Sequence, residues 1–335
     1  MNRFLGIALV AALITALGFG APASADYRQH PEAERFVTEM TEHHGFDEAQ
    51  MRAWMAEAER QDGILEAIAR PAERTRTWAE YRPIFLQPLR VTRGVEFWQS
   101  HRDAFERAEA TYGVPPEVIL AIIGVETNYG RTMGSHRVID ALTTLAFDYP
   151  PRAPFFRREL EQYFILMREQ KQNPLAFKGS YAGAMGFGQF MPSSYRHYAV
   201  DFDGDGLVDI WHNPTDAIGS VANYFAEHGW QRDGLVAVRA RAGASLNRGA
   251  KEDWNRIEPP EQTVKDWQAR GLVPIFPLPG ETPANALALE GDFGEEFWLA
   301  FQNFYVITRY NRSHLYALAV QQLSQAIKTA METQS

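Results

Sequence analysis

Residues 115–130 read PPEVILAIIGVETNYG, and this stretch decides how the chain is interpreted. Prolines at the first positions and an acid in the first turn are typical of a helix start. The run from Val118 to Ile123 is apolar on every side, which predicts a helix buried in the interior of the fold. Glu126 is the only acid at the exit of this helix.

Glu126 is the candidate general acid. Apolar surroundings disfavour an ionised carboxylate, and the C-terminus of a helix carries partial negative charge. Both effects predict a raised pKa, which lets a carboxyl group hold a proton near neutral pH. Glutamate is common at helix ends, so a side chain that simply faces solvent is the alternative.

A glycine-rich stretch, KGSYAGAMGFGQFMPSSY, covers residues 178–195. Small residues allow a backbone to approach a ligand closely. Ser180, Tyr181 and Gln189 supply hydrogen-bonding groups of the kind a sugar needs. A phosphate-binding loop is a weak interpretation, because no GK[ST] follows the glycines. Tight packing of helices through small residues is the alternative.

The hydrophobic spacing predicts a mainly α fold with a minor β part. Residues 71–88 contain three prolines and predict a looser stretch, and Leu235–Val238 is a short strand candidate. From Glu295 onward the spacing again predicts helix. The helical patterns before that point cover 32–70, 95–111, 115–126, 135–147, 155–170 and 216–228.

Composition excludes several classes of protein. A length of 335 residues suggests about two domains, or one core with attached lobes. The 33 basic and 42 acidic residues leave a formal charge of −9, which argues against a nucleic-acid binder. The absence of cysteine excludes disulfides, thiolate metal sites, a cysteine nucleophile and a cysteine-linked lipid anchor. The usual motifs of nucleotide enzymes, zincins and elbow-type serine hydrolases are also absent.

The N-terminus has the three parts of a secretory signal. Arg3 precedes an apolar run over 4–19, and Ala23-Ser24-Ala25 forms a cleavage pattern. We therefore expect residues 1–25 to be a signal peptide and 26–335 to be the mature protein. An uncleaved anchor helix is the alternative, but the run is shorter than the ~20 residues that span a membrane.

Taken together, GVETNYG and KGSYAGAMGFGQFMPSSY resemble the membrane-bound lytic murein transglycosylase B family, lysozyme-like enzymes that cleave peptidoglycan. The resemblance continues through AVDFDGDG, DAIGSVANYF and FYVITRYNRSHLYALAV, in the order of the family, from about residue 78 to 325. It implies a mainly α (α+β) fold with a lysozyme-like core. The expected division is a signal peptide over 1–25, a helical N-terminal lobe over 26–95, a catalytic core over 96–231, a small β-containing insert over 232–294, and a C-terminal helical segment over 295–335 that completes the core.

An acidic loop predicts a cation site. Asp201, Asp203 and Asp205 occupy positions 1, 3 and 5 of an EF-hand pattern, with glycine at position 6 and the carbonyl of Leu207 at position 7. Position 12 is His212 instead of glutamate. The resemblance implies a longer EF-hand-like loop over 201–216, closed by Asp216, although this chain carries one extra residue before it. We expect a weakly bound structural Ca²⁺ and no organic cofactor. A solvated acidic turn is the alternative for the loop, and helix capping is the alternative for Asp216.

The number of carboxylates bears on the mechanism. Ordinary glycosidases use two, and nothing in the sequence singles out Asp140 or Asp148 as a partner for Glu126. The resemblance implies that one glutamate suffices. As an acid it protonates the bridging oxygen of the β-1,4 bond between N-acetylmuramic acid and N-acetylglucosamine. As a base it then accepts the proton of the C6 hydroxyl, which closes on C1 to give a 1,6-anhydro end.

The resemblance also implies the substrate-binding residues and the partner. The family has two arginines where this chain has Pro151-Arg152. Peptidoglycan glycan strands are the expected partner, with no nucleic acid and no lipid anchor, and a soluble periplasmic location is expected. A hydrolytic muramidase and a non-catalytic, calcium-stabilised cell-wall-binding protein are the alternative functions. The implied substrate-binding residues are Ser180, Gln189, Tyr224, Tyr310, Asn311, Tyr316, Tyr81 and Arg152, although core packing is the alternative for each tyrosine.

Overall fold

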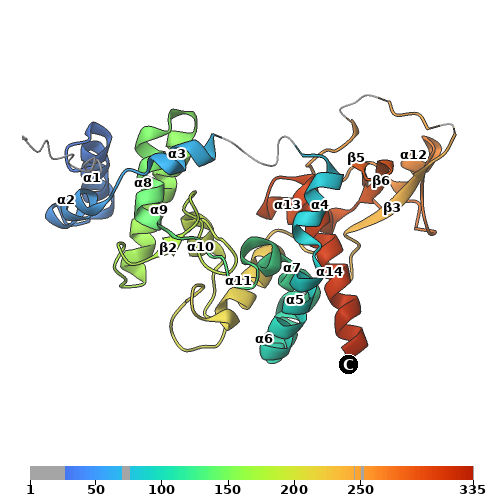
Figure 1. The fold of residues 1–335 in the computed structure, drawn as a ribbon, viewed down its shortest axis with the longest axis horizontal. Coiled ribbons are helices and arrows are strands. Elements are labelled where there is room, and N and C mark those ends of the chain that lie inside the picture. Colours follow the sequence, from blue (N-terminus) through green and yellow to red (C-terminus); the bar gives the residue numbers. More distant parts are fainter. Residues whose placement is uncertain (1–26, 70–75, 245, 250–252, 335) are drawn as a thin grey trace, which may run out of the picture.

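The computed structural model describes residues 27–69, 76–244, 246–249 and 253–334. The expected signal peptide over 1–25 lies outside the described residues. The predicted mainly α class is confirmed, and the molecule is elongated, with α1 and α2 at one end and a small sheet at the other (Figure 1). The helices are α1 (Pro31–His44), α2 (Glu48–Glu57), α3 (Asp62–Ile68), α4 (Trp78–Phe85), α5 (Pro88–Ser100), α6 (Arg102–Tyr112), α7 (Pro116–Thr127), α8 (Val138–Asp148), α9 (Ala153–Glu169), α10 (Pro192–Tyr198), α11 (Pro214–Glu227), α12 (Val264–Ala269), α13 (Gln302–Tyr310) and α14 (His314–Gln334), with a short 3₁₀ turn η2 (Pro150–Arg152).

The strands form two antiparallel sheets. A two-stranded sheet pairs β1 (His136–Arg137) with β2 (Lys178–Gly179). The larger sheet has the order β4-β3-β6-β5. Its members are β3 (Ala237–Ala242), β4 (Leu272–Pro274), β5 (Asn285–Gly291) and β6 (Gly294–Ala300).

The helix expected from Glu295 is wrong, because residues 294–300 form β6, which pairs with β3 on one side and β5 on the other. Gly291 and Gly294 face each other across the two-residue connection between β5 and β6. Short glycine-flanked connections favour a hairpin over a helix start. The helical pattern that the sequence suggested begins only at Gln302.

Residues 78–85 also differ from the looser stretch that was expected. Thr77 and Glu80 form a capping box at the start of α4, and Pro83 lies inside the helix. Trp78 and Tyr81, one turn apart, are both buried, so packing holds this proline-containing helix in place. The pattern over 95–111 is interrupted at His101, where α5 ends and α6 begins.

The apolar interior has three parts. The N-terminal cluster, with Phe36 and Phe164, joins buried residues of 27–64 to those of 138–167, and it also takes in Met185 and Phe190 of the glycine-rich stretch. The central cluster surrounds α7 and α14, and it also takes in Trp78, Tyr81 and Val95 from the expected N-terminal lobe. The sheet cluster gathers around Trp267.

Helix α7 is buried as predicted, since Ile119, Leu120 and Ile123 are completely inaccessible to solvent. Among the described residues, no single helix has the length and apolar character to cross a membrane. Only α6 and α7 taken together, bent at 114°, reach that length and composition.

Candidate active site

The end of α7 places Glu126. Three successive residues then adopt the left-handed conformation, with φ of 50° at Asn128, 61° at Tyr129 and 78° at Gly130. The amides of Asn128 and Tyr129 donate to the carbonyls of Gly124 and Ile123, which is a Schellman-type end. The helix therefore stops directly behind the half-buried Glu126, and the chain turns away from it.

A tyrosine from the C-terminal helix holds the Glu126 carboxylate. The hydroxyl of Tyr316, on α14, donates to Oε1 of Glu126 at 2.5 Å. Burial of Tyr316, followed by the charge of Glu126, raises the pKa of this phenol well above its ordinary value. Tyr316 therefore stays protonated and remains a hydrogen-bond donor at any physiological pH.

The two other carboxylates considered from the sequence are engaged elsewhere. Asp140 accepts from Nε and Nη2 of Arg137 at 2.7 and 2.9 Å, and from the amide of Glu59 at 2.9 Å. Asp148 accepts from the hydroxyl of Tyr27 at 2.6 Å. Both side chains tie N-terminal segments to α8, which is a structural role.

The glycine-rich stretch packs its backbone closely against other backbone. A Cβ added at Gly179 would lie 2.2 Å from the carbonyl oxygen of Ala184, and one at Gly186 would lie 2.4 Å from that of Ile210. Both glycines therefore meet the requirement for close approach that the sequence suggested, but their neighbours are protein atoms. The close contacts at these two positions join non-helical backbone segments, so they differ from the helix packing that was the alternative.

The side chains of Ser180 and Gln189 serve this same turn. Ser180 Oγ accepts from the amides of Ala182 and Ala184. Gln189 has a φ of 52°, and its Nε2 donates to the carbonyls of Met133 and Gly186. The side-chain amide of Gln189 thus joins the turn after α7 to the glycine-rich stretch.

Two tyrosine hydroxyls connect α13 to other segments: Tyr310 bonds to the glycine-rich stretch, and Tyr224 of α11 bonds to α13. The hydroxyl of Tyr310 donates to the carbonyl of Gly188 at 2.5 Å, and that of Tyr224 donates to the carbonyl of Arg309 at 2.6 Å. Their rings lie 4.8 Å apart in an edge-to-face arrangement. Burial and the nearby Glu126 raise the pKa of Tyr310, so this ring also belongs to the surroundings of the candidate acid.

The remaining expected residues lie in different settings. Tyr81 is buried, and its proximity is the smallest of the causes that raise the pKa of Tyr316. Asn311 follows α13, and its amide donates to the carbonyl of Ile307. Arg152 is exposed and lies over the ring of Phe155 at 4.5 Å, so its contacts are local to its own segment.

Sequence reasoning missed Arg90. This α5 side chain donates to the carbonyl of Gly124 at 2.7 Å, two residues before the candidate acid. Burial lowers the pKa of its guanidinium. Nothing in the local sequence around Arg90 signals this contact, because α5 and α7 meet only in the folded chain.

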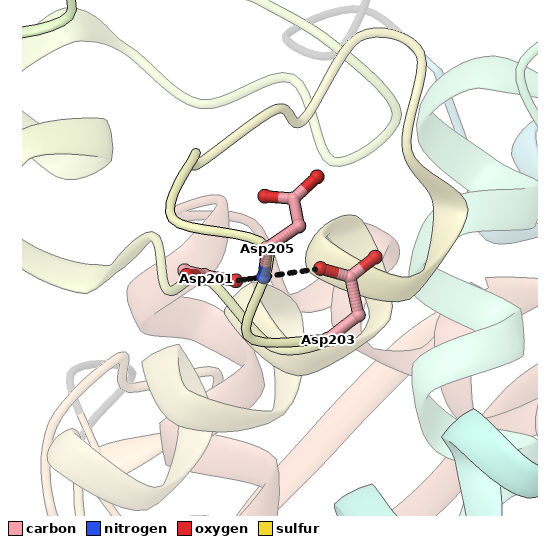
Figure 2. Close-up of side chains that lie close together, drawn as sticks. All are labelled: Asp201, Asp203 and Asp205. Atoms are coloured by element: carbon pink, nitrogen blue, oxygen red, sulfur yellow. Dashed lines mark hydrogen bonds between the residues drawn. The ribbon is translucent and has the colours of Figure 1, made fainter.

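The acidic loop gathers three carboxylates. Oxygens of Asp201, Asp203 and Asp205 lie within 4.8 Å of one another. Asp201 accepts from the amides of Gly204 and Gly206 at 2.7 and 2.8 Å. The amide of Asp205 also points between Asp201 and Asp203, 3.2 Å from an oxygen of each, as Figure 2 shows. The loop therefore has the compact form of an oxygen-rich cation site.

Asp216 lies at the closing end of this loop. Its two oxygens accept from the amides of Phe202 and Asp209, both at 2.8 Å, and its side chain is fully buried. Burial is the main cause that raises the pKa of Asp216. Asn213, not Asp216, caps α11. His212 turns toward Asp209, with Nδ1 3.1 Å from Oδ2.

This donor set fits a hard cation. Each carboxylate oxygen has two lone-pair directions, so those of Asp216 keep one free after accepting from the backbone. Within the described ranges, no lysine or arginine pairs with Asp201, Asp203, Asp205 or Asp216. A cation bound here would offset the mutual repulsion of these groups.

The chain matches the family described as Transglycosylase SLT domain over residues 28–325. It is 45% identical to the membrane-bound lytic murein transglycosylase B of Escherichia coli over 315 residues, which cover 91% of this chain and 85% of that protein.

Two solved structures are similar along nearly their whole length. Soluble lytic transglycosylase SltB1 from Pseudomonas aeruginosa is 50% identical with a TM-score of 0.84, covering 90% of this chain and 99% of that one. The Escherichia coli lytic transglycosylase Slt35 in complex with calcium is 44% identical with a TM-score of 0.84, covering 92% of this chain and 96% of that one.

Proposed function

The chain belongs to the transglycosylase SLT domain family and is a lytic murein transglycosylase, and we propose that it works through one carboxylate, that of Glu126. The observation that carries this proposal is the set of hydrogen bonds made by the carboxylates near α7 and α8. Glu126 is held by a permanently protonated Tyr316, whereas Asp140 and Asp148 are committed to other contacts.

In the first step the protonated Glu126 gives its proton to the oxygen that links N-acetylmuramic acid to N-acetylglucosamine. The bond between that oxygen and C1 breaks, and the N-acetylglucosamine end leaves as an alcohol. The carbonyl oxygen of the muramoyl acetamido group bonds to C1, so no protein nucleophile is required.

In the second step the ionised Glu126 accepts the proton of the C6 hydroxyl. O6 then bonds to C1 and displaces the acetamido oxygen. The product carries a 1,6-anhydro bridge, no water is consumed, and Glu126 is protonated again for the next cycle. Between the two steps the Tyr316 hydroxyl donates to the carboxylate and holds it in place.

Around this acid we propose that Tyr81, Tyr224, Tyr310 and Tyr316 form the wall of the sugar site, since aromatic rings suit sugar faces. The hydroxyl protons of Tyr224 and Tyr310 are used within the protein, so these two act mainly through their rings. We assign Ser180, Gln189 and Asn311 to the same lining, and we propose that the exposed Arg152 binds an acidic group of the substrate.

We further propose that Asp201, Asp203 and Asp205 hold Ca²⁺ together with the carbonyl of Leu207 and the carboxylate of Asp216. The calcium complex of Slt35, a protein 44% identical to this one, supports this assignment. The ion would stabilise the loop that precedes α11 and would take no part in the chemistry. The proposed location is the periplasm, in soluble form, because the family acts on peptidoglycan and the 50% identical SltB1 of Pseudomonas aeruginosa is described as soluble.

The test is mass spectrometry of the fragments released from sacculi by residues 26–335, beside Glu126→Gln and the exposed control Glu106→Gln. We expect fragments lighter than reducing muropeptides by one water from the wild type and the control, and none from Glu126→Gln. Reducing ends would indicate a muramidase that uses water. Binding without released fragments would indicate a wall-binding protein, and a cleaving Glu126→Gln would refute the role of Glu126.

A further inference from the structure

A cavity of about 230 Å³ lies beside the turn that follows α7. One wall is the C-terminal half of α5, with Arg93 and Phe97, and the cap residue His101. The opposite wall is Tyr129 and Arg131. Binding sites for whole drug-sized ligands span roughly 300–1,000 Å³, so this space fits one group of a larger ligand.

The floor of this cavity is aromatic and rigid. The ring of Phe97 lies 4.6 Å from that of His101 and 5.8 Å from that of Tyr129. Burial lowers the pKa of His101, so the imidazole is neutral near pH 7. Small apolar groups, such as the methyl of an alanyl residue, can pack on such a surface.

The charge of the cavity comes from two guanidinium groups. No carboxylate of the described residues forms an ion pair with Arg93 or Arg131, unlike Arg137 and Arg196, which are paired. The one acid of the lining is Glu96, an exposed residue of α5. Two cations against one anion leave a positive cavity in a chain of formal charge −9.

The position of the cavity ties it to the candidate acid. Arg131 follows Glu126 by five residues along the turn fixed by Gly130, where an added Cβ would meet Phe187 at 2.2 Å. The amide of Gly130 also donates to Thr127 Oγ1 at 3.0 Å. Three residues after Gly130, the carbonyl of Met133 accepts from Nε2 of Gln189. Arg131 therefore lies on the turn that connects Glu126 to the contact between Met133 and Gln189, one of the proposed substrate-binding residues.

We propose that the Arg93–Arg131 cavity is a carboxylate subsite that holds the peptide stem of a muramoyl residue during cleavage. The inference rests on the proposed function. Peptide stems carry free carboxylates and alanyl methyls, and a planar guanidinium matches a carboxylate with two parallel hydrogen bonds. The subsite would give the enzyme a preference for peptide-bearing strands over stripped glycan.

The test compares kcat/KM on peptide-bearing strands and on strands stripped of their stems by an amidase. The variants are Arg93→Gln, Arg131→Gln and their double variant. The control is Arg102→Gln, which removes the same charge one residue beyond the cavity. We expect each single variant to lose about tenfold on peptide-bearing strands and nothing on stripped strands. Arg93→Lys, which keeps the charge, should lose less and serves if Arg93→Gln unfolds.

Three results would overturn this subsite. Equal losses on both substrates would mean that the arginines act on the glycan or on stability. No loss on peptide-bearing strands would mean that no stem binds there. In the third result, acetate raises the melting temperature of the wild type but not of the variants, and all variants cleave both substrates as the wild type does. This would mean that the cavity binds free small carboxylates and not peptide stems. Failure of the proposed function is distinct, because the wild type would then release no anhydro ends from either substrate.

Discussion

Replacing Gly186 by alanine tests the interpretation of the glycine-rich stretch most sharply. Gly186 has a φ of 69°, and its added Cβ would lie 2.4 Å from the carbonyl oxygen of Ile210. That carbonyl accepts from the amide of Phe187 at 3.0 Å, so a new methyl group would push apart two bonded backbone segments. Met185 belongs to the N-terminal cluster and Phe187 to the central cluster. The strain caused by the new methyl group would therefore act where the two clusters meet.

The magnitude follows from two costs. A left-handed conformation costs an L-residue roughly 1–2 kcal/mol, and forcing an extra carbon into a packed site costs roughly 1–3 kcal/mol. We therefore expect Gly186→Ala to lower the free energy of unfolding by about 2–5 kcal/mol. At roughly 2 °C per kcal/mol for a chain of this size, the melting temperature should fall by about 4–10 °C.

Two other glycines separate the two costs. Gly45 has a φ of 65° and Gly63 lies in α3, and neither has an atom within 4 Å of an added Cβ. Gly45→Ala should lose only the conformational cost, about 1–2 kcal/mol. Gly63→Ala should gain up to about 1 kcal/mol, because alanine is the better helix former. Calorimetry on the three variants measures these shifts, and a Gly186→Ala protein that melts with Gly45→Ala would refute the contact argument.

Three further outcomes are expected. Tyr316→Phe removes the hydrogen-bond donor to Glu126. Such a bond to a charged acceptor is worth roughly 1.5–3 kcal/mol, so the release of anhydro fragments should slow by about tenfold to a hundredfold. An unchanged rate at an unchanged melting temperature would exclude this role of Tyr316. After treatment with a chelator, millimolar Ca²⁺ should stabilise the protein by roughly 1–2 kcal/mol if its Kd is ~10⁻⁴ M. Asp203→Asn should abolish most of the resulting rise in melting temperature. A melting temperature that chelator does not change would refute the proposed Ca²⁺ site. Burial lowers the pKa of His314, so as the pH falls the unfolded chain binds a proton there before the folded chain does. The free energy of unfolding should therefore decrease as the pH drops below 6.5. The melting temperature of His314→Gln should depend less on pH in this range, and an equal dependence in both proteins would contradict this.

The sequence was most informative where one physical signal dominated. An unbroken apolar run predicted the buried α7, and glycine spacing predicted a stretch of close backbone approach, although the partners of Gly179 and Gly186 are protein atoms. The acids of 201–205 predicted a cation site, and oxygens of Asp201, Asp203 and Asp205 lie within 4.8 Å of one another, as such a site requires. Each of these signals lies within one short segment, so it can be recognised without knowledge of the tertiary fold.

Features that depend on distant partners could not be predicted in this way. Residues 294–300 resemble a helix by spacing but pair with β3 and β5, so strand neighbours decide their structure. Helix α4 contains Pro83, and the burial of Trp78 and Tyr81 in the central cluster holds this helix in place. The donation of Arg90 to Gly124 depends on how α5 meets α7.

The hydrogen bond between Tyr316 and Glu126 joins residues 190 positions apart. A ribosome makes the N-terminal part of a chain first, and that part can begin to fold before the rest exists. The acid is thus made long before its donor, and α14, the last helix, completes the site. A chain cut before α14 would carry Glu126 without the Tyr316 hydroxyl, so the site around the acid depends on a helix that lies far along the chain from it.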